Sequence, residues 1–221
     1  MTPASPSPWR LCVDVSAADV DGDIVFLDVR HDTYVCLPGG AGDLGLRPGS
    51  RTVDVANADL AAELRAAGLI GRHADAPPPQ PCPDPPRQSA LKDAYPQPVP
   101  IDGVEMVSAL LDLRLHYHRR PFHDIVAAVR RDRAAPPRVS AALLEAVDQF
   151  HRWSPYLPAS GKCLLRSFVL ARMLRRRGLD ALWVFGVRTW PFHAHCWLQC
   201  EDLALDEQPD RIRAYTPILA V

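Results

Sequence analysis

Three side chains in the second half of the sequence have the types and the order needed for nucleophilic catalysis. Cys163 lies in the first turn of a predicted helix, where unpaired N–H groups and the positive end of the helix dipole favour a thiolate, and Lys162 adds positive charge. His195 falls in the middle of a predicted strand, and Asp206 lies on the strand that follows. Antiparallel pairing can bring Asp206 beside His195. The thiolate would attack, the imidazole would accept and return the proton, and the carboxylate would fix the imidazole tautomer.

Each of these residues also has an ordinary structural interpretation, and spacing alone does not decide between the two. Cys163 can be a buried core cysteine, and His195 a hydrogen-bonded histidine of a sheet. A metal site is a third interpretation, since His193, Cys196 and Cys200 surround His195. In a strand, however, the two histidines face one side and the two cysteines the other. We therefore expect no metal site here.

The elements that must position these residues form a C-terminal unit of residues 99–221. Apolar residues at helical spacing predict helices over 104–118, 124–133, 140–151 and 164–177. Ser140 is a good N-cap for the third helix, and Gly178 after three arginines ends the fourth. The period then changes from 3.6 to 2, which predicts consecutive antiparallel strands over 182–188, 194–200 and 203–206.

A proline-rich stretch separates this unit from a smaller one. Ten of the 23 prolines lie between Pro77 and Pro100, so residues 77–98 are predicted to be an extended linker. The N-terminal unit, residues 1–76, has strand-like runs at 9–15, 24–29 and 33–37, followed by a helix between Asn57 and Gly68. A small sheet with a free edge strand beside a helix is suited to capturing an extended peptide.

Composition excludes several classes of protein. The formal net charge of −1 gives no general electrostatic reason to bind nucleic acid or an anionic membrane. No apolar run reaches the length of a transmembrane helix, and the N-terminus lacks the features of a signal peptide. We therefore expect a cytoplasmic protein that does not span a membrane. Its six cysteines include no C-x-x-C pair and are expected to be mostly reduced.

Together these motifs resemble the lasso-peptide leader peptidases, the B proteins of lasso biosynthesis. The resemblance rests on G-K-C-L-L-R-S at 161–167, L-R-R-R-G at 174–178, F-G-V at 185–187, P-F-H-A-H-C-W at 191–197 and L-A-L-D at 203–206. It selects His195 over His193, because His195 precedes one residue and then a tryptophan. Two departures are Cys196, where the family usually has alanine, and Gln199, near a position where glutamate is common.

The resemblance implies an α+β protein in two parts. The N-terminal part would be a small winged-helix-like recognition domain, a three-stranded sheet plus helices, similar to the carrier protein of pyrroloquinoline quinone biosynthesis. After the Pro-rich linker would come a papain/transglutaminase-like domain with N-terminal helices and an antiparallel sheet. A leader peptide would add as a strand beside the third strand and pack on the helix, which makes the candidate binding residues Thr33, Tyr34, Val35, Cys36, Leu37, Leu60 and Leu64.

It also implies an activity and partners. The chain would be a cysteine peptidase with Cys163 as nucleophile, His195 as general base and acid, and Asp206 orienting the histidine. It would remove the leader from a lasso precursor peptide and use no cofactor of its own. The partner would be an ATP-dependent, asparagine-synthetase-like cyclase that closes the macrolactam at the freed amine. Two other functions remain open: a Cys-His-Asp acyltransferase, and a leader-binding adaptor without catalysis.

Overall fold

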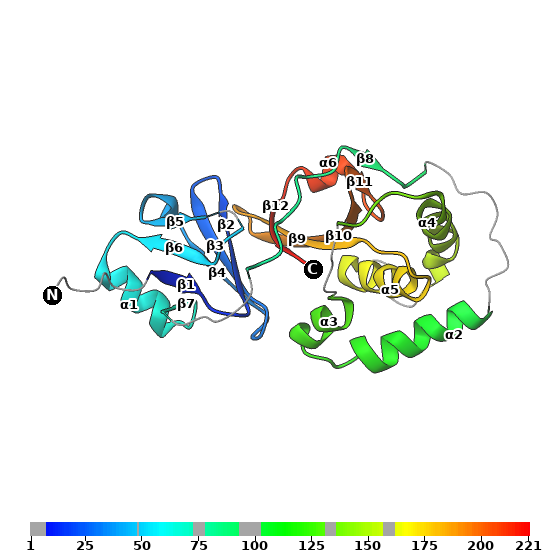
Figure 1. Cartoon of the computed structure of the whole chain (residues 1–221), viewed down its shortest axis with the longest axis horizontal. Coiled ribbons are helices and arrows are strands. Elements are labelled where there is room, and N and C mark those ends of the chain that lie inside the picture. Colours follow the sequence, from blue (N-terminus) through cyan, green and yellow to red (C-terminus); the bar gives the residue numbers. More distant parts are fainter. Residues whose placement is uncertain (1–7, 48, 73–77, 93–102, 131–135, 157–161) are drawn as a thin grey trace. The chain divides into compact units, whose positions relative to one another are not determined.

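The structure, a computed structural model, describes residues 8–47, 49–72, 78–92, 103–130, 136–156 and 162–221. Its contacts divide the chain into unit 1, Met1–Cys82, and unit 2, Pro83–Val221 (Figure 1). The division falls inside the proline-rich stretch. Both helix and sheet are present, as the α+β prediction requires.

Unit 1 contains two small antiparallel sheets rather than one. The first has the order β2-β3-β4, and the second β5-β6-β1-β7. Its elements are β1 (Trp9–Leu11), β2 (Val15–Val20), β3 (Asp23–Asp28), β4 (Thr33–Leu37), the 3-10 turn η1 (Gly40–Gly42), β5 (Leu44–Leu46), β6 (Thr52–Val55), α1 (Ala58–Ala66) and β7 (Ile70–Gly71). The predicted three strands are therefore too few, because the described part of unit 1 has seven.

The segment 9–15, which the sequence predicts as one strand, contains a turn. The chain turns after β1, and the N–H of Val15 donates to the carbonyl of Cys12. The polar–apolar alternation continues through this turn, so periodicity cannot detect it. The predicted helix, by contrast, is confirmed: the side chain of Asn57 accepts a hydrogen bond from the N–H of Leu60, and Gly68 takes a positive φ of 73° after α1.

The core of unit 1 lies between α1 and strands of both sheets. Its buried residues are all aliphatic or aromatic: Leu11, Val15, Ile24, Phe26, Leu44, Val53, Leu64, Leu69 and Ile70. Since each sheet alone has few residues to bury, joining them through one shared core gives each the apolar contact that a small sheet needs.

From residue 103 onward, unit 2 has helices close to those predicted. They are α2 (Gly103–Asp112), continued by the π-helical turn η2 (Leu113–Tyr117), then α3 (Phe122–Val129), α4 (Ala141–Trp153), the 3-10 turn η3 (Ser154–Tyr156) and α5 (Cys163–Arg176). Ser140 caps α4 by accepting from the N–H of Leu143, and Gly178 has a positive φ of 71° after α5. Most of α5 is buried, because it contacts β10 as well as α2, α3 and α4 (Figure 1).

The helices pack beside a five-stranded sheet of order β12-β9-β10-β11-β8. The predicted hairpin is confirmed in β9 (Leu182–Arg188) and β10 (His193–Cys200), which are antiparallel with His195 opposite Gly186. β11 (Leu203–Ala204) is shorter than predicted, and β12 (Thr216–Ala220), which follows the short helix α6 (Pro209–Ile212), was not predicted.

The fifth strand comes from the proline-rich stretch. β8 (Gln88–Ser89) runs parallel to β11 at the edge of the sheet, with Leu203 opposite Gln88 and Ala204 opposite Ser89. An edge is where a proline-flanked strand is tolerated, because one side of its backbone needs no partner. This part of the predicted linker is therefore part of unit 2.

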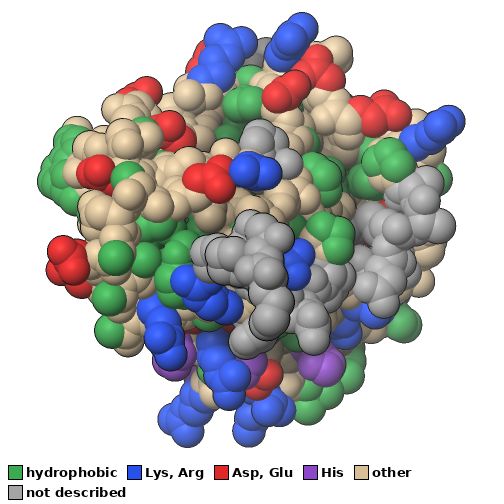
Figure 2. Space-filling model, turned by 60° about the vertical axis from the view of Figure 1, so that its left-hand side comes forward, with side chains coloured by type: hydrophobic (Ala, Val, Ile, Leu, Met, Phe, Trp, Pro, Cys, Tyr) green, Lys and Arg blue, Asp and Glu red, His purple; other side chains and the backbone are tan. Residues whose placement is uncertain are grey.

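Acidic and basic side chains share the surface, as the nearly zero net charge predicts. Both kinds are visible on the face in Figure 2, where several basic side chains gather at the lower edge near histidines. Among the residues that the structure describes, no helix is both long and apolar enough to span a bilayer.

Candidate active site

Cys163 is the first residue of α5, and Lys162 is the N-cap residue. The side chain of Cys163 is partly exposed, as a nucleophile must be. Its position at the start of the helix places the thiol near unpaired backbone N–H groups and the positive end of the helix dipole. The sequence prediction for this residue's place in the fold is confirmed.

Hydrogen bonds from β10 favour the thiolate of Cys163. The largest contribution comes from the thiol of Cys196, followed by a hydrogen bond from His195 and one from the backbone of Cys196, and together they outweigh the opposing effect of burial. They lower the pKa of Cys163 to about 4. Cys163 would therefore be ionised at neutral pH, which is the reactive form of a cysteine.

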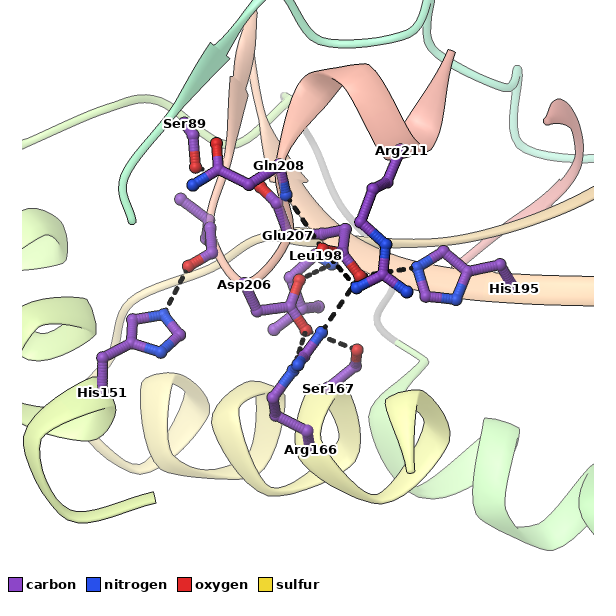
Figure 3. Close-up of polar contacts among 11 residues, drawn as sticks. Ser89, His151, Arg166, Ser167, His195, Leu198, Asp206, Glu207, Gln208 and Arg211 are labelled. Carbon is purple, nitrogen blue, oxygen red and sulfur yellow. Dashed lines mark hydrogen bonds and ion pairs between the residues drawn. The ribbon is translucent and has the colours of Figure 1, made fainter. Parts of the chain in front are cut away.

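His195 lies on β10 between the thiol and a carboxylate. Its Nε2 is 2.9 Å from Oε2 of Glu207 (Figure 3). This leaves Nδ1 as the ring nitrogen that can face Cys163. Burial alone would lower the pKa of His195, but hydrogen bonds and charge from Cys163 and Glu207 outweigh it and raise the pKa to about 9. The pair is thus a thiolate and an imidazolium over a wide range around neutral pH.

Glu207 is held in its ionised form. Burial would raise its pKa, but the hydrogen bond from His195, the N–H of Gln208 and the charges of Arg166 and Arg211 lower it to about 2. The guanidinium of Arg166 donates to Oε2 of Glu207 at 3.3 Å, from one turn beyond Cys163 on α5 (Figure 3). Oε1 of Glu207 accepts from the N–H of Gln208 at 3.0 Å. This carboxylate is therefore fixed from several directions while it binds the imidazole.

Asp206 does not contact His195, which corrects the predicted third member. Its Oδ2 accepts from the hydroxyl of Ser167 at 2.5 Å, and its Oδ1 accepts from the N–H of Leu198 at 2.8 Å. β11 ends at Ala204 and the chain then bends, so that Asp206 faces α5 and the next residue, Glu207, faces the imidazole. Burial raises the pKa of Asp206 against the opposing effect of its partners.

A second buried histidine lies below this network. Nε2 of His151, on α4, is 2.7 Å from the carbonyl oxygen of Leu205, which accepts its proton (Figure 3). Burial lowers the pKa of His151, so it is neutral at neutral pH. Since the bond reaches the backbone just before Asp206, His151 helps to hold the bend that carries both carboxylates.

Aromatic rings lie beside His195. The ring of Tyr215 lies 5.2 Å from the imidazole, measured between centroids, and its hydroxyl is 3.0 Å from Nδ1 of His193. His193 is exposed and bonded to Tyr215, which agrees with the choice of His195 as the reactive histidine. A Cβ at Gly186 would lie 2.8 Å from the Trp197 ring and 2.9 Å from Cβ of Tyr215, so glycine is required there.

Cys196 and Cys200 are buried core residues, as predicted, but Cys196 has a further contact that the sequence did not indicate. Burial and the neighbouring Cys163 raise the pKa of its thiol, although in a regular strand Cys196 should face away from the side of His195. All six cysteines are free thiols. Within the described ranges, no three His, Cys, Asp or Glu side chains are grouped closely enough to hold a metal ion.

The candidate leader-binding residues lie in unit 1. Thr33, Tyr34, Val35, Cys36 and Leu37 form β4, which is an edge strand of its sheet, and 38% of Val35 is exposed. Leu60 and Leu64 lie on α1, but Leu64 is part of the core and Leu60 is partly buried against it. Within the described residues β4 pairs with β3 on one side as an edge strand, whereas Leu64 offers little surface.

Sequence reasoning missed Glu207, Arg166 and Tyr215 as neighbours of the reactive pair. Glu207 directly follows the chosen carboxylate, so the sequence contained two candidates one residue apart. Arg166 is three residues after Cys163 and thus on the same helix face, a spacing that could have indicated it. Nothing in the local sequence indicated Tyr215, whose position depends on the unpredicted β12.

Known proteins resemble this chain in the region that carries the site. The profile of the transglutaminase-like superfamily matches residues 107–220. Over 48 residues the chain is 40% identical to the microcin J25-processing protein McjB of Escherichia coli, which is 22% of this chain and 23% of that protein's length. The match confirms the resemblance to the lasso-peptide leader peptidases. No solved structure matches the chain. Because the superfamily profile covers more than half of the sequence and includes Cys163, His195 and Glu207, the chain belongs to the transglutaminase-like superfamily.

Proposed function

We propose that this chain is a cysteine peptidase that binds a lasso precursor peptide through its leader and cleaves the leader off. The observation that carries the proposal is the pairing of His195 with Glu207 at 2.9 Å, together with a cysteine at the start of α5 whose pKa His195 helps to lower. A buried imidazole between a thiol at a helix start and a fixed carboxylate has the geometry of nucleophilic acyl transfer. The similarity to a microcin J25-processing protein supports a peptide precursor as the substrate.

In the first half of the reaction, the thiolate of Cys163 attacks the carbonyl carbon of the last leader residue. The C–S bond forms as the carbonyl π electrons move to oxygen, and the N–H groups at the start of α5 are positioned to stabilise that oxyanion. The imidazolium of His195 then gives its proton to the leaving amine as the C–N bond breaks. The products are a leader thioester on Cys163 and a core peptide with a free amine.

In the second half, water releases the leader. The now neutral His195 accepts a proton from water, whose oxygen attacks the thioester, and Cys163 leaves as the thiolate. Glu207 does not take the proton, because its pKa is held near 2. Its role is to hold Nε2 of His195, so that Nδ1 faces the sulfur and the imidazolium is stabilised when it forms.

Unit 1 would supply recognition and a second protein would complete the pathway. The edge strand β4 would accept an extended leader as an added strand, so that recognition would belong to a different unit from the reactive cysteine. The freed amine would be the nucleophile for a partner, an ATP-dependent cyclase of the asparagine-synthetase-like kind. The chain itself would need no cofactor for hydrolysis.

The test uses the purified full chain and the peptide encoded by a short reading frame next to its gene. Incubation in water enriched in ¹⁸O, followed by mass spectrometry, should give a free core peptide and a leader whose new carboxylate is 2 Da heavier. Cys163→Ala should give neither product, while fluorescence polarisation should show leader binding within about threefold of the unchanged chain, because the thiol is not part of the recognition unit.

The same experiment separates the two other functions. A leader joined to an added amine, without ¹⁸O, would show transfer to an acceptor and make the chain an acyltransferase. Tight leader binding with no product from the unchanged chain would show an adaptor. Cleavage by Cys163→Ala at the rate of the unchanged chain would disprove the assignment of the nucleophile.

A further inference from the structure

The described end of the proline-rich stretch is bonded to unit 2 along most of its length. The side chain of Gln199 donates to the carbonyl of Asp84 at 2.8 Å. The N–H of Arg87 donates to the carboxylate of Asp202 at 2.9 Å, and the N–H of Ala90 donates to the carbonyl of Ala204 at 2.8 Å. This stretch is thus a structural part of the unit that holds the reactive residues, and it is also the connection to unit 1.

Ser89 is the residue of β8 that reaches the site. Its hydroxyl donates to the backbone carbonyl of Glu207 at 3.0 Å and accepts from the N–H of Leu91 at 3.0 Å. A hydroxyl has one proton, so these two bonds fix its orientation. Figure 3 shows Ser89 beside the bend that carries Glu207.

The backbone of Glu207 needs such support. The bend after β11 is not part of the sheet ladder, so the position of Glu207 depends on its own contacts. Arg166, Arg211 and His195 bind its carboxylate, whereas Ser89 binds its main-chain carbonyl. A small displacement of this main chain would move the carboxylate away from Nε2 of His195. Both carboxylate oxygens of Glu207 already have hydrogen-bond partners.

We propose that Ser89 is a positioning residue of the reactive site: by holding the main chain of Glu207, it keeps His195 paired with that carboxylate, so the connection between the two units sets the geometry of the site. This rests on the proposed function only where cleavage is measured.

The decisive experiment measures Cys163 directly and needs no substrate. The full chain is treated with iodoacetamide across a range of pH, and mass spectrometry follows alkylation of the peptide that contains Cys163. Ser89→Val and Ser89→Thr are compared, because valine and threonine have nearly the same shape. Valine has a methyl group where threonine has a hydroxyl. Ser89→Val should move the alkylation profile toward alkaline pH. A rise of about one unit in the pKa of Cys163 would slow the reaction about two- to fivefold between pH 5 and 4, because a less stable imidazolium stabilises the thiolate less. Ser89→Thr should restore the profile.

A matched control comes from unit 1. The hydroxyl of Ser50 accepts from the N–H of Thr52 at 3.0 Å, which is the same local bond that Ser89 makes with Leu91, but it lies in the other unit. Ser50→Ala should leave the profile unchanged. The proposal is overturned if Ser89→Val keeps the unchanged profile, or if its only effect is a lower melting temperature that Ser50→Ala reproduces.

Cleavage gives a second readout. Under the proposed function, Ser89→Val should lower kcat by about three- to tenfold and leave KM nearly constant, since leader binding does not involve the site. If the unchanged chain cleaves nothing, the proposed function fails, but the alkylation profiles still decide the role of Ser89. If Ser89→Val does not fold, Ser89→Ala in the same assay replaces it, with Ser89→Thr still the comparison.

Discussion

Nε2 of His195 lies 2.9 Å from Oε2 of Glu207, whereas Asp206, the preceding residue, binds Ser167 and the backbone of Leu198. The two neighbouring carboxylates therefore have opposite electrostatic environments. The pKa of Glu207 is lowered to about 2 by its partners, while burial raises that of Asp206. Groups whose pKa values are separated in this way have separate roles. Glu207 is suited to stabilise a cation, and Asp206 to hold α5 against the sheet.

Replacing Glu207 with glutamine should impair leader cleavage more than replacing Asp206 with asparagine. Glutamine keeps the size but removes the charge that stabilises the imidazolium, and its amide NH2 can donate to Nε2 and so favour the wrong tautomer. We expect kcat to fall by roughly 10- to 1,000-fold. Asp206→Asn is the matched control and should cost mainly stability. Steady-state kinetics of both variants would decide, and a dead Asp206→Asn beside an active Glu207→Gln would restore Asp206 as the third member.

The His195–Glu207 pair should stabilise the fold over a limited pH range. Glu207 falls from its ordinary pKa of 4.5 to about 2, so its contribution is present above 4.5 and is lost as the pH drops toward 2. The pKa of His195 is raised from 6.5 to about 9. Its contribution to stability is therefore present below pH 6.5 and is lost as the pH rises toward 9. The stability difference between the unchanged chain and Glu207→Gln should therefore peak between these limits, at no more than about 3 kcal/mol. Urea unfolding across pH measures it, and a difference that does not vary with pH would contradict the pairing.

The two histidines of β10 should differ sharply. His195→Ala removes the group that protonates the leaving amine and should be as severe as Cys163→Ala, since members of one catalytic unit fail together. His193→Ala removes an exposed ring bonded to Tyr215 and should lower the rate by less than about tenfold. Cleavage assays on both variants test this. If His193→Ala were the inactive variant, the assignment of the segment would be wrong by two residues.

Cys196 should lower the pH at which the thiolate of Cys163 becomes protonated. Its thiol is the largest contribution that lowers the pKa of Cys163, so Cys196→Ala should raise that pKa. A rise of about one unit would slow alkylation of Cys163 about two- to fivefold between pH 5 and 4 and leave the rate near pH 7 almost constant. Cys196→Ser keeps a donor and should lie between the two. If Cys196→Ala and the unchanged chain gave the same alkylation profile, Cys196 would have no effect on the pKa of Cys163.

Leader recognition should depend on the backbone of β4. Successive N–H groups of a strand point to opposite sides, so of Val35→Pro and Cys36→Pro one removes a bond to β3 and the other an outward donor. The variant that keeps the melting temperature should lose leader affinity by about tenfold, because a bound strand would lack one bond. Fluorescence polarisation in a Cys163→Ala background measures binding without cleavage. If both proline variants fold and both bind the leader as tightly as the unchanged chain, leader recognition does not depend on β4.

The features that were predicted well are those that depend on a few neighbouring residues. Asn57, Ser140 and Gly178 mark helix ends through local bonds or a positive φ, and the structure has all three in these roles. Cys163 at a helix start and His195 on a strand follow from the same local patterns, so the reactive pair was accessible from sequence.

The features that were missed depend on distant pairing. β12 contains Pro217 at an irregular step in its register with β9, which hides a strand in the sequence. β8 is only two residues long and is defined by β11, more than a hundred residues later. The choice between Asp206 and Glu207 depends on a bend after β11, and no periodicity distinguishes two adjacent acids at a bend.

The position of β8 also bears on the tendency of unit 2 to aggregate. β11 presents its outward backbone groups to β8, so the sheet edge next to the reactive site is already covered. An exposed strand edge is a template for pairing with another chain, and proteins avoid this by covering it or by placing proline there. The stretch from Pro83 provides both, with prolines at 83, 85 and 86 directly before the strand. A catalytic fragment that begins at residue 99 would lack this cover, and its open edge would favour intermolecular pairing and aggregation.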